Sequence, residues 1–375
     1  MLRVLFDTSM LWIDSLAKRG IYYFALNMLK YLNKYSSSEI EVIPYSITKN
    51  GGLQDIIKMP YNIVSTLKKI RGFNVDLIFI PHSRTFTHVL INYIMSKPVN
   101  IVIHDVHFLV VQTPAMYKFR MIPRYTAIRD AVRIKDNIVI TTVSRFSKYA
   151  IERYLKIDPN RVFVVYPGID EIFRPIDREL AKQFVRMKYG IENEYFIYVG
   201  AVSKRKGVYD LIKAFSMFIE GYNRNLSLLL AGPLEDPNVL KLINKFGNIK
   251  YLGHVPRGDL PMLFSASIAF IYPSYHEGFG LPPLEAAACG TPLIVSRIPV
   301  FQETIGDAGI FVDPGNIGHL VNAMSTIIDD RDLRLNLAYR ALARAKLFTW
   351  KRAVRSYIRL WWRIMEWMWR SSGLI

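Results

Sequence analysis

Short apolar runs alternate with longer stretches in which apolar residues recur at helical spacing, from one end of the chain to the other. Most of the runs are continuous rather than alternating, which is typical of parallel strands buried on both faces. Helical patterns such as Tyr23–Leu32 and Tyr209–Phe218 lie between them. The strands expected from these runs are Val4–Phe6, Glu41–Tyr45, Leu77–Ile80, Asn100–Ile103, Ile138–Thr142 and Val162–Val165, then Phe196–Val199, Leu226–Leu230, Tyr251–Leu252, Ile268–Tyr272, Leu293–Val295 and Ile310–Val312.

This order of elements repeats the β-α-β unit in two series, and a break separates them. The segment Tyr166–Asp177 carries two prolines, a glycine and three acidic residues between a finished strand and a new helix. The pattern predicts two doubly wound α/β domains, at about 1–170 and 171–350. Ligands of such folds bind beyond the carboxyl ends of the strands, so we expect the active site in a cleft between the domains.

Composition narrows the class of protein. The 375 residues are 51% hydrophobic and 21% charged, which is typical of a globular chain and excludes long disorder. No apolar run is long enough for a transmembrane helix, and the first apolar stretch meets Asp7 too early for a signal peptide. The one cysteine, Cys289, excludes an intrachain disulfide and a zinc site of several thiolates, and favours a reducing, intracellular compartment.

The most informative segment begins where a buried strand ends, at Tyr272. Gly278 and Gly280 follow in a loop and let the backbone approach a ligand closely. Pro282 or Pro283 then supplies a residue of the first turn of a helix.

That helix is expected to stop at Gly290, with Glu285 in about its first turn. Its N-terminus therefore points at the glycine loop, where free N–H groups and the helix dipole favour a phosphate. A carboxylate at Glu285 is near enough to accept hydrogen bonds from a sugar.

The segment has three other possible interpretations. Gly278-x-Gly280 begins like a dinucleotide-binding fingerprint, but Pro283 stands where that fingerprint has Gly or Ala. Glu277 and Glu285 could form the carboxylate pair of a glycosidase, which requires a separation of about 5–9.5 Å. Both glutamates could also be merely solvated.

The segment resembles the E-x7-E motif of the retaining glycosyltransferases of family 4, which have the GT-B fold. In that family the first glutamate contacts the donor sugar and the second binds the ribose, which implies those roles for Glu277 and Glu285. The resemblance is closest to the mannosyltransferase-like branch and covers nearly the whole chain. The other matching blocks are Thr142–Ser147, Arg161–Pro175, Phe196–Gly207, Gly253–Leu263 and Phe301–Asp313.

Arg205 and Lys206 match the diphosphate-binding turn of the family, which also contains Gly200. Departure of a nucleoside diphosphate develops negative charge on its terminal phosphate. Two fixed cations stabilise that charge more in the transition state than in the ground state. An exposed basic turn would be the alternative if this motif stood alone.

His104 and Asp105 end a strand of the first domain, where the family has an H-D pair whose histidine lies near the transferred sugar. The triplet His104, Asp105 and His107 also has metal-ligand chemistry, and His104 could instead simply bond to backbone. Lys18-Arg19-Gly20 stands where the family has a glycine-rich turn, but Tyr22 replaces its second glycine, which puts a phosphate role for Gly20 in doubt.

Asp330-Arg331-Asp332 has the form of the D-x-D metal motif of the other glycosyltransferase fold. It lies between two helical patterns, where aspartate commonly caps a helix. We therefore interpret it as a helix cap in a solvent loop and expect no metal.

The net charge of +18 arises from 49 Lys and Arg against 31 Asp and Glu. Such a surface attracts nucleic acid, anionic lipid or phosphorylated small molecules. Two stretches carry much of the charge: Tyr117–Lys135, and the Arg-rich segment Trp350–Arg370, which holds five of the six tryptophans. The second stretch suits a membrane interface, but the last helix of a GT-B enzyme also packs back on the first domain, so its tryptophans could be core.

The family resemblance implies a retaining, metal-independent glycosyltransferase with an acceptor-binding N-terminal domain (1–170, with helix 351–375 packed on it) and a nucleotide-sugar-binding C-terminal domain (171–350). On the same resemblance, GDP-mannose is the first candidate donor, and a glycan or lipid-linked molecule is the expected acceptor. We expect a cytoplasmic protein at an anionic membrane surface and, because no nucleic-acid motif occurs, no nucleic-acid partner. The alternative is a GT-B protein that binds a nucleotide or glycan without turnover. The expected catalytic residues are Glu277, Arg205, Lys206 and His104, and the expected donor-binding residues are Glu285, Gly278, Phe279, Gly280, Leu281, Gly200 and Gly20.

Overall fold

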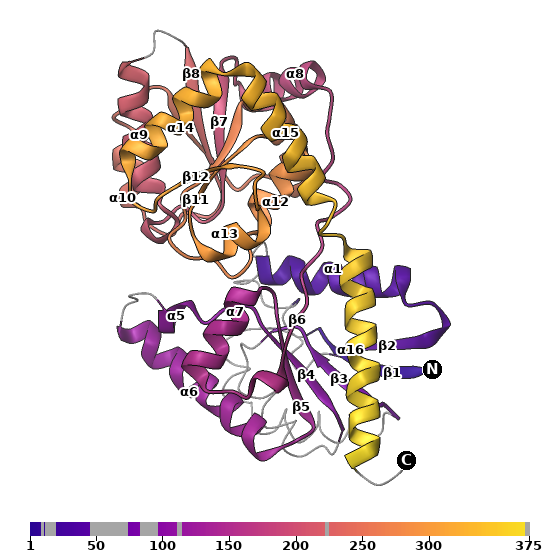
Figure 1. The fold of residues 1–375 in the computed structure, drawn as a ribbon. Coiled ribbons are helices and arrows are strands. Elements are labelled where there is room, and N and C mark those ends of the chain that lie inside the picture. Colours follow the sequence, from indigo (N-terminus) through magenta and orange to yellow (C-terminus); the bar gives the residue numbers. More distant parts are fainter. Residues whose placement is uncertain are drawn as a thin grey trace. The chain divides into compact units, whose positions relative to one another are not determined.

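The computed structural model describes residues 1–8, 11, 20–45, 74–82, 97–110, 115–221 and 225–371, and the side chains at 37, 115–120, 124 and 371 lie outside this description (Figure 1). The chain forms two compact units. Unit 1 consists of Met1–Gly168 and Trp350–Ile375, and unit 2 of Ile169–Thr349. Each unit is described by itself below.

Unit 1 is built on a parallel sheet of six strands in the order β2-β1-β3-β4-β5-β6. Every residue of β3, β4 and β5 is buried, which is why these runs are apolar without alternation. The strands are β1 (Leu2–Asp7), β2 (Ile40–Tyr45), β3 (Leu77–Ile80), β4 (Val99–Ile103), β5 (Ile138–Thr142) and β6 (Val162–Val164).

Helices and short turns connect these strands. The Ser144 hydroxyl begins α7 by accepting a hydrogen bond from the Ser147 amide (3.0 Å), an N-cap of the usual kind. The helices are α1 (Gly20–Tyr35), α5 (His107–Val110), α6 (Ala115–Ile134), α7 (Arg145–Ala150) and α16 (Trp350–Ser371), and the short turns are η3 (Ser37–Glu39), η4 (Ile151–Leu155) and η5 (Pro159–Arg161).

The last helix, α16, belongs to the core of unit 1, where it lies beside α1 although more than 300 residues separate them (Figure 1). Trp350 stacks on Tyr31 with ring centroids 5.8 Å apart. Trp361 is fully buried, and its Nε1 donates to the Asn100 side-chain oxygen at 3.1 Å. Asn100 in turn donates to the Thr141 hydroxyl at 3.1 Å, so a buried polar chain fixes α16 against β4 and β5.

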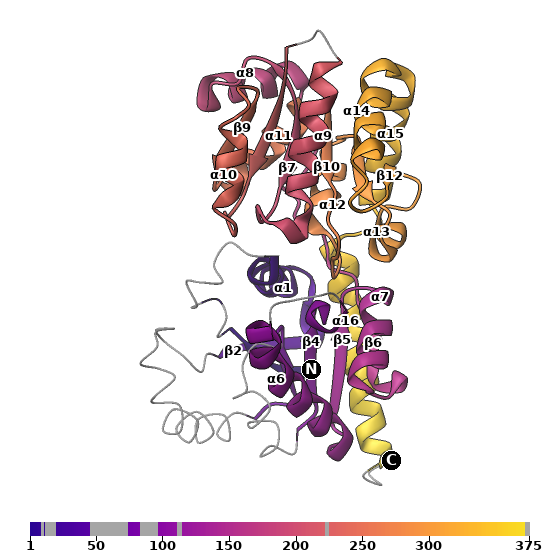
Figure 2. The same cartoon turned by 90° about the vertical axis from the view of Figure 1, so that its left-hand side faces the viewer.

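Unit 2 has a second parallel sheet of six strands, in the order β12-β11-β10-β7-β8-β9. Among its helices, α9 packs on α14, α8 on α11 and α12 on α15, and α14 and α15 lie side by side (Figure 2). The strands are β7 (Glu194–Val199), β8 (Leu226–Ala231), β9 (Ile249–Gly253), β10 (Ala269–Tyr272), β11 (Leu293–Ser296) and β12 (Ile310–Val312). The helices are α8 (Arg178–Tyr189), α9 (Val208–Glu220), α10 (Asn238–Ile243), α11 (Leu260–Ala266), α12 (Leu281–Ala288), α13 (Pro299–Thr304), α14 (Ile317–Asp329) and α15 (Arg331–Ala345), with short turns η6 (Lys204–Lys206) and η7 (Arg257–Asp259).

The two parallel sheets confirm the predicted doubly wound α/β class. All twelve expected runs fall within strands, give or take a residue at the ends, and the helical patterns Tyr23–Leu32 and Tyr209–Phe218 lie within α1 and α9. Across the described ranges, no helix has the length and apolarity needed to cross a membrane.

Candidate functional site

The candidate site of unit 2 lies at the point where the strand order of its sheet reverses, between β7 and β10. The chain runs outward from β7 to β8 and β9, returns to place β10 on the other side of β7, and continues to β11 and β12. Ligands of doubly wound folds bind at the carboxyl ends of the two strands that flank such a switch point. The loop after β7 carries the expected Arg-Lys turn, and the loop after β10 carries the glycine loop and Glu277.

Direct contacts join these two loops. The Tyr275 amide donates to the Arg205 carbonyl at 3.2 Å, and the Tyr275 hydroxyl donates to the Asp210 carboxylate at 2.7 Å. Gly207 has a φ of +70°, and a Cβ there would lie only 2.1 Å from the Pro273 carbonyl oxygen. Glycine is therefore required at 207 both for the backbone conformation and for the close approach of the loops.

Two stacked tyrosines of the sheet pack beneath the start of the loop after β7. Tyr198 is the residue before the last of β7, Tyr272 ends β10, and their rings stack with centroids 5.3 Å apart. Gly200 packs on them, since a Cβ there would lie 2.8 Å from the Tyr198 hydroxyl and 3.1 Å from the Tyr272 ring. Burial raises the pKa of both hydroxyls well above the ordinary value, so both remain protonated. The packing against this pair therefore favours glycine at 200, and the expected contact of Gly200 with the donor remains a prediction.

Lys206 and Glu277 form a hydrogen-bonded ion pair across the two loops, with side chains only 10% and 12% exposed. Burial by itself raises the pKa of Glu277, but the charge and hydrogen bond of Lys206, the Arg205 charge and a Ser274 hydrogen bond together hold it below the ordinary value. Glu277 is therefore a carboxylate at neutral pH. Arg205 is more exposed and lies 4.0 Å from Glu235.

The second glutamate of the motif, Glu285, also has a cationic partner. Arg257, at the start of η7, donates from its guanidinium to the Glu285 carboxylate at 2.6 Å. The Glu285 side chain is 4% exposed and that of Arg257 is 19% exposed. Burial raises the pKa of Glu285, and Arg257 opposes that rise. The sequence analysis did not identify Arg257, because nothing in the order of residues indicates that it reaches α12.

The start and end of α12 follow the sequence prediction. Gly280 precedes the helix with a φ of +88°, and a Cβ there would lie 2.5 Å from the Phe301 ring. Gly290 follows it with a φ of +77°. Because Pro282 and Pro283 carry no N–H, this helix end offers fewer donors to an anion than we expected, which leaves more of the charge compensation to the nearby cations.

The remaining expected residues of this loop lie around the helix start. Phe279 is buried and packs edge-on against Phe348 at 5.6 Å, and Leu281 is the first residue of α12. Glu285 is the fifth residue of the helix rather than a residue of its first turn.

In unit 1, His104 follows β4 directly, as expected. Its Nε2 lies 2.9 Å from the Pro81 carbonyl oxygen, and its ring meets the edge of Phe24 at 4.7 Å. This is the backbone-bonded arrangement weighed from the sequence, and a role toward a sugar remains a prediction. His107 Nδ1 lies 2.7 Å from the Asp105 carboxylate.

A buried pair that the sequence analysis missed lies at the switch point of unit 1, between β1 and β3. Asp7 ends β1, His82 follows β3, and their side chains lie 3.5 Å apart with no exposure to solvent. Burial and the Asp7 charge also raise the pKa of the nearby Tyr45 hydroxyl. A charged residue directly after a buried strand was the available signal for Asp7.

Gly20 is the exposed first residue of α1, and a Cβ there would meet no atom within 4 Å. The neighbouring Lys18 and Arg19 lie outside the described residues. The geometry of this turn therefore does not require glycine at 20, and its proposed contact with the donor remains a prediction.

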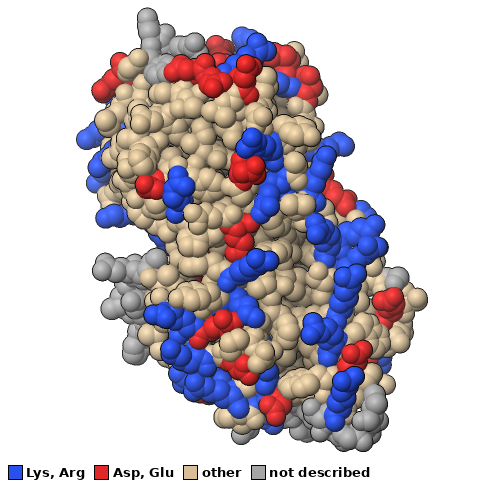
Figure 3. Space-filling view, in the orientation of Figure 1, with Lys and Arg blue, Asp and Glu red and all other residues tan. Residues whose placement is uncertain are grey.

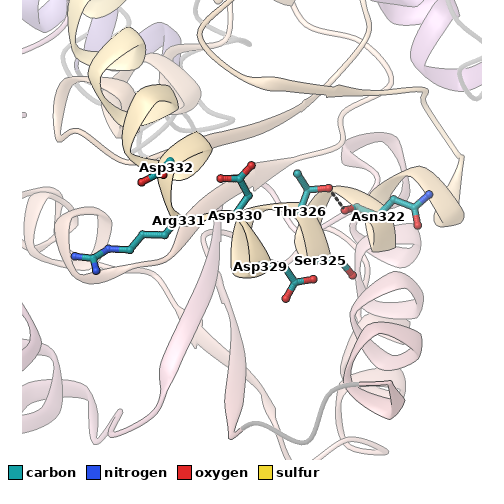
Figure 4. Close-up of a pocket in the computed structure, with 7 residues that line it drawn as sticks. All are labelled: Asn322, Ser325, Thr326, Asp329, Asp330, Arg331 and Asp332. Carbon is teal, nitrogen blue, oxygen red and sulfur yellow. Dashed lines mark hydrogen bonds between the residues drawn. The ribbon is translucent and has the colours of Figure 1, made fainter.

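The Asp330-Arg331-Asp332 segment is a helix cap, as expected. Asp330 begins α15 by accepting a hydrogen bond from the Leu333 amide at 2.8 Å. Figure 4 shows the surrounding pocket, in which the carboxylates of Asp329, Asp330 and Asp332 point in different directions. Within the part of the chain that the structure describes, no group of three or more His, Cys, Asp or Glu is placed to hold a metal ion.

Models of known protein families match both halves of the chain. The family model of glycosyltransferase family 4 matches residues 15–172, and that of the glycosyl transferases group 1 matches residues 182–344. The O-antigen chain mannosyltransferase B of Escherichia coli is 33% identical over 220 residues. That alignment covers 57% of this chain and 57% of the relative, so the chain spans little more than half the relative's length.

Solved structures match over nearly the whole chain. Sucrose-phosphate synthase from Thermosynechococcus elongatus has a TM-score of 0.76 at 17% identity, covering 98% of this chain and 100% of its own. Alr3699/HepE from Anabaena, solved in complex with UDP-glucose, has a TM-score of 0.74 at 18% identity and covers 96% and 98%. These likenesses show the fold, which is GT-B. With both halves matched by its models, the chain belongs to the family 4 (group 1) glycosyltransferases.

Proposed function

We propose that this protein is a retaining glycosyltransferase that moves a hexose from a sugar nucleotide to a glycan or lipid-linked acceptor. The observation that carries the proposal is the pairing of the two motif glutamates with cations at the switch point of unit 2. Glu277 pairs with Lys206, and Glu285 pairs with Arg257. Charged groups of both signs, held in low-dielectric surroundings, suit a ligand that carries both phosphates and hydroxyls.

Each side chain has a role in the proposed reaction. Arg205 and Lys206 bind the diphosphate, Glu285 accepts hydrogen bonds from the ribose, and Glu277 orients the sugar. The acceptor hydroxyl attacks the anomeric carbon on the face from which the diphosphate departs. The bond from that carbon to the phosphate oxygen breaks, a bond to the acceptor oxygen forms, and the acceptor proton passes to the departing phosphate. No side-chain base is then needed.

Other parts of the site assist in this proposal. Backbone groups of Gly278 to Gly280 and Leu281 support Glu277 in holding the donor, and His104 of unit 1 contacts the sugar. The reaction needs no metal, because Arg205 and Lys206 can neutralise the leaving diphosphate.

The first candidate for the transferred sugar is mannose, from GDP-mannose. The support is the similarity to an O-antigen chain mannosyltransferase, whereas the structural neighbour solved with UDP-glucose keeps a uridine donor open. To identify the donor, the unfolding temperature is measured with each member of a panel, GDP-mannose, UDP-glucose or UDP-N-acetylglucosamine, and the donor is the sugar nucleotide that raises it. A donor at 100 times its dissociation constant stabilises the protein by about 2.7 kcal/mol.

The same panel tests catalysis when release of the nucleoside diphosphate is followed over time with and without a glycan acceptor. We expect slow hydrolysis of one donor by the protein and its loss in the Lys206→Ala variant. Binding of a donor with no release of nucleoside diphosphate under any condition would instead support a GT-B protein that binds without turnover.

We also propose that the protein acts at an anionic membrane surface. Figure 3 shows a row of Lys and Arg side chains over α16, and these basic residues are exposed, whereas Trp350 and Trp361 are buried. The row consists of Lys351, Arg352, Arg355, Arg359 and Arg363. Each cation near an anionic surface contributes about 1 kcal/mol.

A second basic region is α6 with the residue that follows it. Arg129, Arg133 and Lys135 are at least partly exposed there, and the side chains of Lys118, Arg120 and Arg124 lie outside the described ones. Co-sedimentation with phosphatidylglycerol and phosphatidylcholine vesicles tests the proposal. We expect binding to phosphatidylglycerol alone, and its loss at 1 M salt, where the Debye length is about 3 Å. Equal binding to both lipids, or to neither, would contradict it.

A further inference from the structure

Arg257 pairs with Glu285 but has no role of its own in the proposed reaction. It lies in a different loop from both donor-binding motifs, at the start of η7, which follows β9 at the edge of the sheet. The turn is anchored from α8, because Asp259 accepts a hydrogen bond from the Tyr189 hydroxyl and pairs with Lys188, both at 2.6 Å. A long side chain therefore extends from a fixed backbone to Glu285.

The contact between the two side chains is well defined. One terminal nitrogen of Arg257 lies 2.6 Å from Oε1 of Glu285, the short distance of a charge-assisted hydrogen bond. The guanidinium also lies over the Phe173 ring, 4.7 Å from its centroid, which limits its rotation. Because guanidinium has donors only, Arg257 cannot accept a hydrogen bond from a hydroxyl, and that capacity stays with Glu285.

We propose that Arg257 is a positioning residue of the nucleotide site, which keeps the Glu285 carboxylate charged and oriented so that it accepts the ribose hydroxyls of a nucleoside diphosphate. This rests on the proposed function, in which Glu285 binds the ribose. Arg257 occupies one carboxylate oxygen, and a carboxylate has about four acceptor sites on its two oxygens. The ribose hydroxyls then use the remaining sites.

The charges around Glu285 make this support necessary. Burial and the charge of Asp170 both favour the protonated form of Glu285, and Arg257 is the cation that opposes them. The Cys289 thiol, one helical turn further along α12, stays neutral because burial and the Glu285 charge raise its pKa. Without the opposition of Arg257, burial and the Asp170 charge would raise the pKa of Glu285 further, and a protonated carboxyl group accepts hydrogen bonds poorly.

The test measures the affinity of UDP and GDP by calorimetry at pH 6.5 and 8.5 for wild type, Arg257→Met and Arg257→Lys. We expect Arg257→Met to bind about tenfold to a hundredfold more weakly at pH 6.5, the range for a lost bond to a charged acceptor. The deficit relative to wild type shrinks at pH 8.5, where a larger fraction of Glu285 is ionised, and Arg257→Lys restores most of the affinity. The matched control is Arg297→Met, which removes an exposed pair with Asp313.

A second measurement repeats the comparison in a Glu285→Gln background, where no buried carboxylate needs a counter-ion. In that background, Arg257→Met should cause no further loss of affinity. The double variant should also fold more readily than Arg257→Met alone, because it leaves no buried carboxylate at 285 without a cation. A deficit that is independent of pH, or that persists with Glu285→Gln, would overturn the inference and make Arg257 a structural residue or a direct nucleotide contact. Failure of the wild type to bind either nucleotide would instead overturn the proposed function.

Discussion

Replacing Lys206 by methionine removes the cation paired with Glu277 and keeps the length of the side chain. Both side chains are about nine-tenths buried, and removing one partner of a buried pair costs about 3–5 kcal/mol because the other charge remains uncompensated. Since both side chains keep a little exposure to solvent, we expect a value at the lower end, about 3 kcal/mol. The matched control is Lys182→Met, which breaks an exposed pair with Glu179 and should have little effect.

The pH dependence of this cost separates its electrostatic part from lost packing. In the wild type the pKa of Glu277 is below its unfolded value, so the pair contributes stability above that unfolded pKa and loses it as pH falls through the folded pKa. In Lys206→Met, burial acts with less opposition and raises the pKa of Glu277. Stability is then lost as pH rises past the unfolded pKa. The difference between variant and wild type should therefore be larger at pH 7.5 than at pH 5.

Urea unfolding can be followed separately in each unit. All six tryptophans belong to unit 1, whereas the one cysteine, Cys289, is buried in unit 2. Reaction of the Cys289 thiol with dithiodipyridine reports unit 2, and tryptophan fluorescence serves as the internal control. An equal loss at both pH values, or an undiminished loss in a Glu277→Gln background, would refute the electrostatic reasoning.

Three further outcomes are expected. Gly207→Ala should destabilise unit 2 by clearly more than Gly190→Ala in parallel urea titrations. Both positions have positive φ, but only at Gly207 would the added Cβ clash, with the Pro273 carbonyl oxygen. Equal effects would show that this clash does not contribute to the loss of stability. Trp361→Phe should lower the stability of unit 1 by about 1–3 kcal/mol in fluorescence-monitored unfolding, since it leaves the buried Asn100 oxygen without its donor; an unchanged midpoint would contradict this. Donor turnover should survive EDTA, and a loss restored by magnesium or manganese would show that the proposed metal-free mechanism is wrong.

The strands were predictable because most are continuous apolar runs, and burial on both faces leaves no other pattern at β3, β4 or β5. The ends of α12 were predictable because Gly280 and Gly290 need positive φ, which few other residues adopt. Strands and helix ends depend on residues that are consecutive in the chain, so a single sequence is enough to predict them.

Contacts between distant loops were not predictable in the same way. Arg257 and Glu285 are 28 residues apart, and Asp7 and His82 are 75 apart, so only the packed sheet brings each pair together. The sequence also left open which face of α16 is buried. The helical period places Arg355, Arg359 and Arg363 on one stripe, but only packing against α1 and the sheet shows that Trp350 and Trp361 fill the core.

The return of the chain into unit 1 has a consequence for its biosynthesis. Unit 2 is one continuous stretch, whereas unit 1 needs α16, which leaves the ribosome only after the whole of unit 2. At about 5–20 residues per second, making Ile169–Thr349 delays that helix by on the order of ten seconds or more. During this delay, Val4, Phe6 and Phe79 lack the apolar cover that α16 later provides. We therefore expect the nascent first half to expose this apolar surface, which favours aggregation, until α16 docks, even though its sheet precedes unit 2 in the chain.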